Sequence, residues 1–223
     1  MSKILLAVMS CHSRPAFSDA VRSTWAPRVQ GADLRFFLGR GPNQPKDDEV
    51  MLDCDDSYHG IPEKVQSILR WAYERGYDFV AKLDDDIIMD PKRFLVLTGH
   101  NDFMGMGKTV DGTAETLQMP YGYCYVLSRT AMKYIIDSPL PWDNADYNPV
   151  HRYNDEYWVS WTLQRAGIYL HVEWSCKLWE GVPSMYPELP DTTVFCVHLH
   201  NRMSPPEEVH EMCRIWRASF QNG

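Results

Sequence analysis

The sequence has no hydrophobic run long enough to cross a membrane. A transmembrane helix needs about 20 predominantly apolar residues, whereas the early run Ile4–Met9 is short and Pro15 follows it soon afterwards. A secretory signal likewise requires a longer apolar segment behind a basic start. We therefore expect neither a membrane span nor an export signal in this chain.

Cysteine and positive charge are also scarce. Six cysteines stand in 223 residues without a C-x-x-C pair or a zinc-ligand spacing, so we expect reduced thiols in a cytosolic protein. Lysine and arginine number 22 against 30 aspartates and glutamates, which gives a formal net charge of -8. This sign opposes non-specific binding to nucleic acid or to anionic membranes. The sequence indicates no oligomeric state.

Composition and patterning predict a single globular α/β domain. Hydrophobic residues make up 44% of the chain and charged residues 23%, which is enough to build a core. Ile4–Met9, Leu34–Leu38 and Phe79–Leu83 have the pattern of buried strands, and Ile61–Ala72 has the 3.6-residue apolar period of a helix. Strands that alternate with helices predict a mostly parallel central sheet flanked by helices.

The most informative segment carries three consecutive aspartates, Asp84, Asp85 and Asp86, between the apolar runs Phe79–Leu83 and Ile87–Met89. Adjacent like charges in partly desolvated surroundings oppose ionisation, so such a cluster needs a compensating cation. In an extended chain the first and third aspartates point to one side and the second to the other. We therefore expect Asp84 and Asp86 to share Mg²⁺ or Mn²⁺, because all-oxygen ligation favours these ions over zinc.

Other interpretations of this segment stay open. A strand ending in Asp-x-Asp also suits a haloacid-dehalogenase-type phosphatase, with Asp84 as nucleophile and Asp86 as acid or base. A third hypothesis is a non-catalytic carbohydrate-binding module that uses the aromatic residues of the C-terminal half, with the aspartates purely structural. An EF-hand is excluded, because the segment lacks the central glycine and the alternating ligands of that motif.

Several separated segments stand in an order shared with one known family. They are Val21–Trp25 (I-R-x-T-W), Phe36–Gly39 (F-x-x-G), Asp56–Tyr58 with Lys64 (D-S-Y…K), Lys82 with Asp84–Asp86 (K-x-D-D-D), Gly122–Ser128 (G-x-G-Y-V-x-S), and Asn154–Tyr157 with Gly167–Ile168 (E-D-V…G-I). This ordered set resembles the family 31 glycosyltransferases, which include β-1,3-galactosyl- and N-acetylglucosaminyltransferases and fringe-like enzymes. The acidic pair of the last segment is reversed here.

The resemblance implies a GT-A fold, a UDP-sugar donor, Mn²⁺ or Mg²⁺ at the Asp-x-Asp motif, and inversion at the anomeric carbon. It also implies a glycan or glycoconjugate acceptor, with residues 1–110 as the nucleotide-sugar-binding half and residues 111–223 as the acceptor-binding half. Family members are commonly anchored in the Golgi through an N-terminal helix and stem. Because a strand follows Met1 directly, we expect a soluble cytoplasmic enzyme of microbial or viral origin, and a Golgi location only for a truncated chain.

Inverting transfer needs a base that deprotonates the attacking hydroxyl of the acceptor. Asp155 and Glu156 lie in the first turn of a predicted helix and are the candidates, with Glu156 first by motif position and Asp155 second. In this family a histidine near the C-terminal end completes the metal site. His198 and His200, on one face of the predicted strand Thr193–His200, are the candidates, and His200 is preferred.

Contacts to the donor are expected around the loop that follows the first strand. The candidates for nucleotide-sugar binding are Ser10, Arg14, Arg22, Asp56, Lys64, Asp84 and Asp85. The three cations among them could pair with donor phosphates or with nearby acidic residues, because charge-assisted contacts suit both. Trp25 and Tyr58 are expected to be core residues rather than ligand contacts.

Overall fold

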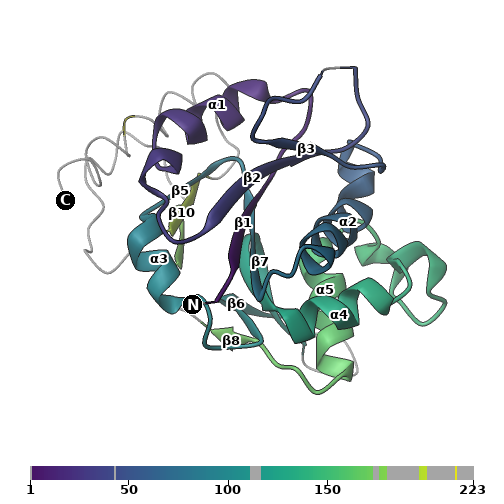
Figure 1. The fold of residues 1–223 in the computed structure, drawn as a ribbon. Coiled ribbons are helices and arrows are strands. Elements are labelled where there is room, and N and C mark those ends of the chain that lie inside the picture. The colour runs from purple at the N-terminus through teal and green to yellow at the C-terminus, as the bar shows by residue number, and fades with distance from the viewer. Residues whose placement is uncertain are drawn as a thin grey trace.

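The computed structural model describes residues 2–42, 44–110, 117–172, 176–179, 196–199 and 214. Its main sheet has seven strands in the order β3-β2-β1-β4-β7-β6-β8 (Figure 1). These strands are β1 (Ile4–Met9), β2 (Asp33–Leu38), β3 (Glu49–Met51), β4 (Phe79–Asp84), β6 (Phe103–Val110), β7 (Leu117–Ser128) and β8 (His171–Val172). The first four pair in parallel, β7 is antiparallel to β4 and β6, and β8 is parallel to β6. The expected mostly parallel sheet is confirmed.

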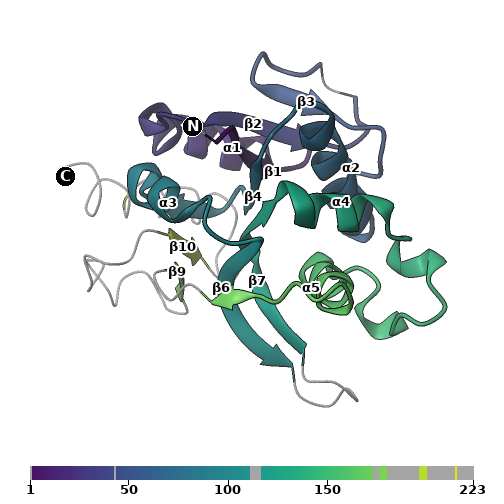
Figure 2. The ribbon, with the colours of Figure 1, turned by 60° about the horizontal axis from the view of Figure 1, so that its bottom comes forward.

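Helices cover both faces of this sheet (Figures 1 and 2). The α-helices are α1 (Pro15–Ser23), α2 (Ile61–Glu74), α3 (Pro91–Leu97), α4 (Arg129–Asp137) and α5 (Asp155–Arg165), and the short 3-10 helices are η1 (Ala26–Arg28), η2 (Tyr58–Gly60), η3 (Pro141–Asp143) and η4 (Pro149–His151). Alternate residues of β1 face opposite layers: Leu6 packs with Phe17 of α1, and Leu5 packs with Leu69 of α2. The sheet thus lies between two apolar cores.

Local sequence signals set the ends of the helices. The side chain of Asn154 caps α5 by accepting a hydrogen bond from the backbone N–H of Tyr157 at 2.8 Å. Gly76, just past the end of α2, has φ 74°, a left-handed conformation that glycine adopts without strain. The apolar pattern of Ile168–Trp174 predicts a strand; β8 holds His171–Val172, residues 168–170 lie before it, and residues 173–174 lie outside the described residues. The capping-box pattern Ser204–Glu207 predicts a last helix, and that segment lies outside the described residues.

The three aspartates do not lie on one extended strand. β4 ends at Asp84, residues 85–86 form a turn, and β5 (Ile87–Met89) belongs to a second sheet with β10 (Cys196–Leu199) and β9 (Cys176–Trp179). This small sheet lies on the same side of the main sheet as α3 (Figures 1 and 2). The expected alternation, with Asp84 and Asp86 on one face and Asp85 on the other, is wrong because the chain turns at the second aspartate.

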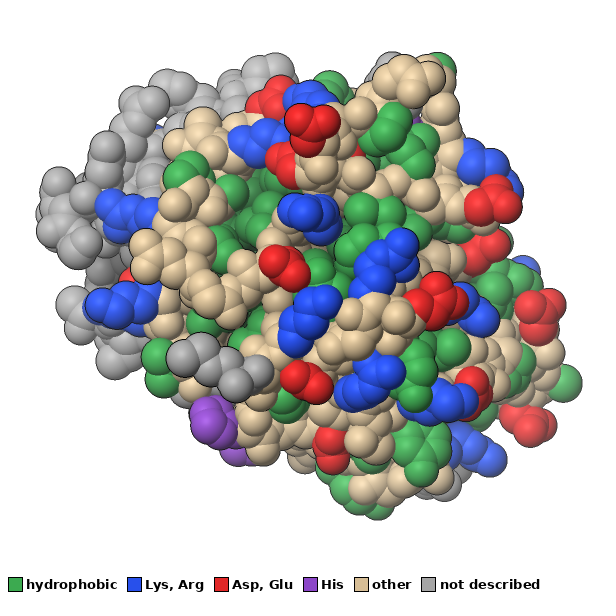
Figure 3. All heavy atoms as spheres, viewed as in Figure 1, with side chains coloured by type: hydrophobic (Ala, Val, Ile, Leu, Met, Phe, Trp, Pro, Cys, Tyr) green, Lys and Arg blue, Asp and Glu red, His purple; other side chains and the backbone are tan. Residues whose placement is uncertain are grey.

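Across the described ranges, no helix combines the length and apolar character needed to cross a membrane. On the face of the molecule in Figure 3, basic and acidic side chains are intermixed. Surface pairs such as Lys46 with Asp19 and Arg40 with Asp53 belong to this pattern of alternating sign. Such exposed pairs contribute little to stability, so the two apolar cores remain the main source of it.

Trp25 connects α1 to the strand that follows the aspartates, and its replacement is expected to be costly. The indole is fully buried, and its Nε1–H donates to the backbone C=O of Ile87 at 3.0 Å. Trp25→Ala should lower the free energy of unfolding by about 3–5 kcal/mol through cavity formation. Trp25→Phe should lower it by about 1–3 kcal/mol, because the carbonyl is left without its donor.

Urea denaturation followed by far-UV circular dichroism measures both changes. Trp142→Phe is the matched control, because 42% of this side chain is exposed, and it should shift the free energy by no more than about 0.5 kcal/mol. Equal midpoints for Trp25→Ala and the control would contradict the anchoring role.

Candidate active site

A buried lysine lies at the carboxyl edge of the main sheet. Lys82 of β4 is 1% exposed, and its Nζ donates to Asp84 Oδ1 at 2.7 Å and to the C=O of Gly122 at 2.5 Å. The same Nζ lies 3.5 Å from Asp155 Oδ2 of α5. Burial alone would lower the pKa of the ammonium, but the carboxylates of Asp155 and Asp84 outweigh it and hold that pKa above its ordinary value. Lys82 therefore stays charged and joins β4, β7 and α5.

The two candidate bases have different surroundings. Asp155 is 5% exposed, and its Oδ2 accepts a hydrogen bond from Tyr125 Oη at 2.7 Å in addition to the Lys82 contact. Glu156 is half-buried, and its Oε1 accepts from Asn154 Nδ2 at 3.1 Å. Its carboxylate lies against Gly122, where an added Cβ would come within 2.9 Å of Oε2. The glycine leaves room for the more accessible of the two carboxylates.

The turn that follows β4 is neutralised in part by Arg14. One guanidinium nitrogen of Arg14 lies 3.1 Å from Asp86 Oδ2 and 3.6 Å from Asp85 Oδ1, and both aspartates are buried. Ser10 Oγ donates to Asp85 Oδ2 at 2.6 Å. Burial and the charge of Asp86 nevertheless raise the pKa of Asp85 to about 7. The turn and the loop after β1 therefore form one charged cluster.

These residues fit a divalent cation only together with an anionic ligand. Among the described residues, no three His, Cys, Asp or Glu side chains gather into a metal site by themselves. Mg²⁺, however, is commonly bound through one or two carboxylates while substrate phosphates and water supply the other oxygens. The edge offers oxygen ligands of this kind. Its ion pairs contain four carboxyl groups but only the two cations Lys82 and Arg14; the carboxyl groups are those of Asp84, Asp85, Asp86 and Asp155.

The strand with the candidate histidines lies beside the acidic turn. β10 runs antiparallel to β5, and His198 is paired with Ile87, the residue that follows Asp86. The backbone thus brings His198 close to the aspartates although the two segments are far apart in sequence. The other candidate, His200, lies outside the described residues.

A second buried ion pair shapes the loop after β1. Lys64 Nζ donates to Asp56 Oδ1 at 2.7 Å and to the C=O of Ser10 at 2.9 Å. Asp56 also accepts hydrogen bonds from the backbone N–H groups of His12, at 2.7 Å, and Gly39, at 2.6 Å. Burial opposes the charge of Asp56, but Lys64 and these N–H groups prevail and lower its pKa. The pair holds together the loops that follow β1, β2 and β3.

One predicted donor contact, Arg22, lies away from the charged cluster and close to the start of β3. Its guanidinium donates to Asp48 and Glu49 at the start of β3 and lies over the ring of Phe36. Arg14 and Arg22 stand at opposite ends of α1, about 12 Å apart along the helix axis at 1.5 Å per residue. Arg22 therefore forms a structural ion pair with the start of β3, and its contact with the donor stays a prediction.

The structure corrects one core assignment and reveals a partner that the sequence did not indicate. Trp25 is buried as expected, but Tyr58 is 69% exposed, so its assignment to the core is wrong. Tyr125, which hydrogen-bonds Asp155, was not among the candidates. The sequence signals a buried charge here only by Lys82, which stands inside the otherwise apolar strand Phe79–Leu83. This signal does not reveal which groups neutralise the charge of Lys82.

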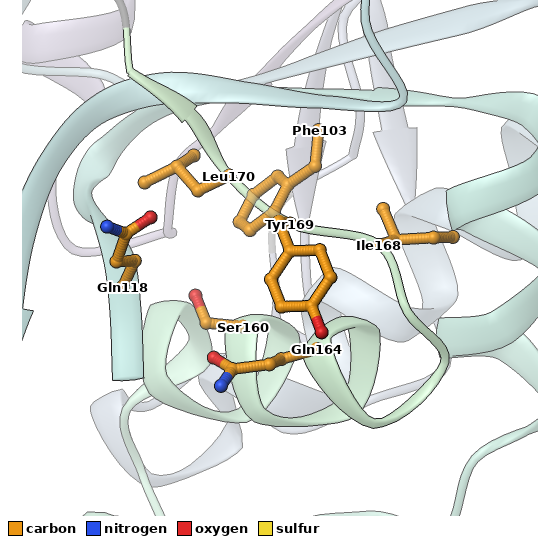
Figure 4. A pocket seen from close by; sticks show the side chains of 7 residues that line it. All are labelled: Phe103, Gln118, Ser160, Gln164, Ile168, Tyr169 and Leu170. Atoms are coloured by element: carbon orange, nitrogen blue, oxygen red, sulfur yellow. The ribbon is translucent and has the colours of Figure 1, made fainter. Parts of the chain in front are cut away.

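A pocket of about 270 Å³ lies away from this cluster, between α5 and the strands β6 and β7 (Figure 4). It is lined by Phe103, Gln118, Ser160, Gln164, Ile168, Tyr169 and Leu170. Ser160 and Gln164 follow Glu156 by one and two helical turns on α5. None of the acidic or basic residues described above lines the pocket, so its location does not coincide with the charged edge.

Comparisons with known proteins agree with the resemblance seen in the sequence. Residues 18–121 match the Galactosyltransferase family. A probable beta-1,3-galactosyltransferase 13 from Arabidopsis thaliana is 31% identical over 101 residues, which cover 35% of this chain and 29% of the plant protein. The chain therefore aligns with less than a third of the length of this curated relative.

A solved structure extends the likeness over nearly the whole fold. It is a glycosyltransferase involved in the glycosylation of the major capsid of PBCV-1, and the match covers 94% of this chain and 98% of that chain, with a TM-score of 0.54. At 13% sequence identity this likeness concerns the fold alone. Residues 18–121 are thus similar to the Galactosyltransferase family, and the fold as a whole is similar to that of a solved glycosyltransferase.

Proposed function

We propose that the chain transfers a sugar from a UDP-sugar to a hydroxyl group of a glycan or glycoconjugate, with inversion and with the help of Mn²⁺ or Mg²⁺. The observation that carries this proposal is the link through Lys82, which contacts Asp84 at 2.7 Å and Asp155 at 3.5 Å. Lys82 thus lies between Asp84, which directly precedes the turn, and Asp155 in the acidic first turn of α5. A donor and an attacking hydroxyl can meet at such an edge.

The charge of the cluster supports an anionic, metal-assisted donor. A nucleoside diphosphate would be repelled by Asp84, Asp85 and Asp86 unless a cation lies between them. We assign Asp84 and Asp86 to that ion, with His198 or His200 as a further ligand, and the bound ion would neutralise the departing diphosphate. Arg14, already 3.1 Å from Asp86, is placed to contact a phosphate as well.

The rest of the donor site follows from the loop after β1. The Asp56–Lys64 pair fixes the backbone of Ser10 and His12 next to the end of β2. Ser10 in turn holds the carboxylate of Asp85. In this proposal these residues position the nucleotide at the carboxyl ends of the parallel strands, where α/β folds commonly bind ligands.

Glu156 is the better of the two candidate bases. A base for inverting transfer must reach the acceptor hydroxyl and carry a lone pair toward it. Asp155 already receives Tyr125 and Lys82 in a buried position, whereas Glu156 is more accessible. We therefore propose that Glu156 takes the proton from the acceptor hydroxyl and that Asp155 positions the start of α5.

The phosphatase and the binding module give different outcomes in solution. A phosphatase would release inorganic phosphate from simple esters and lose that activity on Asp84→Asn. A carbohydrate-binding module would bind glycans equally with or without divalent ions and would ignore nucleotides. The match of residues 18–121 to the Galactosyltransferase family favours neither of them.

Replacement of Asp86 should remove the metal-dependent reaction with the donor. With UDP-galactose and Mn²⁺ but no acceptor, the wild-type chain should release UDP slowly, and EDTA should abolish this release. Asp86→Asn should reduce the rate by about 100-fold or more, since loss of one group that stabilises transition-state charge typically costs this much. Coupled detection of UDP measures the rate, and Asp53→Asn, at a 93% exposed side chain, is the control. Unchanged release by Asp86→Asn would refute the assigned metal role.

The two carboxylates of α5 should separate into a chemical and a positioning role. Glu156→Gln should lower kcat for transfer to a methyl glycoside by about 10²–10⁴-fold, the usual contribution of a general base, while thermal stability and UDP affinity stay unchanged. Asp155→Asn should lower the free energy of unfolding by about 3–5 kcal/mol, because it leaves the buried Lys82 charge poorly compensated.

Product analysis and thermal denaturation of both variants test this assignment. Asp143→Asn, on the surface helix η3, is a control that should change neither property. Retained transfer by Glu156→Gln, together with a loss of transfer in a stable, folded Asp155→Asn, would reverse the two roles.

A further inference from the structure

Three rings form an exposed aromatic group at the charged edge, and we infer that this group binds the acceptor saccharide. The group, called the aromatic platform here, consists of Tyr58, His59 and Tyr153. The ring of His59 lies 6.4 Å from that of Tyr58 and 4.4 Å from that of Tyr153, centroid to centroid, in edge-to-face arrangements. This inference rests on the proposed glycosyl transfer and names the surface that receives the second substrate.

The exposure of the platform is unusual for a structural cluster. Tyr58 is 69% exposed, His59 is exposed and Tyr153 is half-buried. None of the three belongs to either apolar core. Large aromatic side chains usually contribute to the burial of a core. Packing in a core therefore does not explain why His59 of η2 and Tyr153, which precedes α5, meet at the surface. The group is instead suited to contact a ligand.

Its position joins the donor loops to the proposed base. Tyr58 follows Asp56 by two residues, and Asp56 anchors the loops after β1 and β2. Tyr153 immediately precedes Asn154, whose amide holds the carboxylate of Glu156 at 3.1 Å. The contact between His59 and Tyr153 therefore bridges the two parts of the site. A sugar on the platform would lie next to the carboxylate that must take its proton.

The chemistry of the platform selects a neutral saccharide. A pyranose ring has an apolar C–H face and a rim of hydroxyl groups, and tyrosine likewise offers an apolar ring with a polar tip. The nearby charges are of both signs, with Asp55 beside Ser57 and Arg152 5.9 Å from the ring of Tyr153. Carboxylates beside the rings suit an uncharged sugar ring stacked on tyrosine better than a phosphate or a polyanion.

The pocket beside α5 is the competing location for the acceptor. It contains one exposed aromatic residue, Tyr169, which is 66% exposed, close to the 69% of Tyr58. Amide and hydroxyl groups of Gln118, Ser160 and Gln164 border it (Figure 4). The pocket begins a helical turn beyond Glu156, whereas the platform adjoins the cap residue that holds this carboxylate. Tyr169→Ala is therefore both a matched control and a test of the alternative.

Binding can be measured without transfer by saturation-transfer difference NMR. The probes are methyl β-D-galactopyranoside, methyl β-D-glucopyranoside and methyl N-acetyl-β-D-glucosaminide, each titrated into the full chain with UDP and Mn²⁺ present. Tyr58→Ala and Tyr153→Ala should weaken binding of the recognised glycoside by about tenfold, as expected for the loss of one stacking ring. Tyr58→Phe should keep most of the affinity, and Tyr169→Ala should keep all of it.

The outcomes separate the platform from the proposed function. Release of UDP from UDP-galactose should be equal in Tyr58→Ala, Tyr153→Ala and wild type, and thermal denaturation verifies that each variant is folded. Wild-type affinity in both alanine variants, weaker binding only in Tyr169→Ala, or no binding of any probe to the wild-type chain would each overturn the platform. Absence of UDP release from the wild-type chain would instead defeat the proposed function.

Discussion

The site depends on the compensation of one buried positive charge. An isolated ammonium in a protein interior is strongly disfavoured, so Lys82 can be buried only where carboxylates and a carbonyl surround it. Asp84 on its own strand, Gly122 on the neighbouring strand and Asp155 at the start of α5 meet that requirement. The same contacts fix α5 against the carboxyl edge of the sheet. The location of Glu156, the next residue, follows from them.

Carboxylates outnumber cations in the ion pairs at the carboxyl edge of the sheet. The proposed metal-dependent chemistry depends on this excess of negative charge. Arg14 spans the turn of Asp85 and Asp86, and Lys82 lies between Asp84 and Asp155. A divalent cation would offset this negative excess, and the same ion could bind the phosphate oxygens of an anionic donor. In the proposed function, the substrate brings its phosphate oxygens to this edge together with that ion.

The elements with strong local signals were predicted well, and the errors have a common cause. The strand Ile4–Met9 lies where expected, and α5 begins at the acidic pair as expected, because apolar periodicity and capping act over a few residues. The alternation assumed for Asp84–Asp86 failed because a turn interrupts the strand. The assignment of Tyr58 to the core is wrong, and the ion pairs of Arg22 were not predicted, because their surroundings, the segment before α5 and the start of β3, come from distant parts of the chain.

The sequence by itself determined the class of fold, the three adjacent aspartates and the acidic pair at a helix start, since each depends on residues close together in the chain. Only the tertiary structure decided which charges neutralise one another: Lys82 with Asp155, Lys64 with Asp56, and Arg14 with Asp86. The physical reason is that the energy of a buried charge depends on groups within a few ångströms in space. Their separation along the chain does not reveal that proximity.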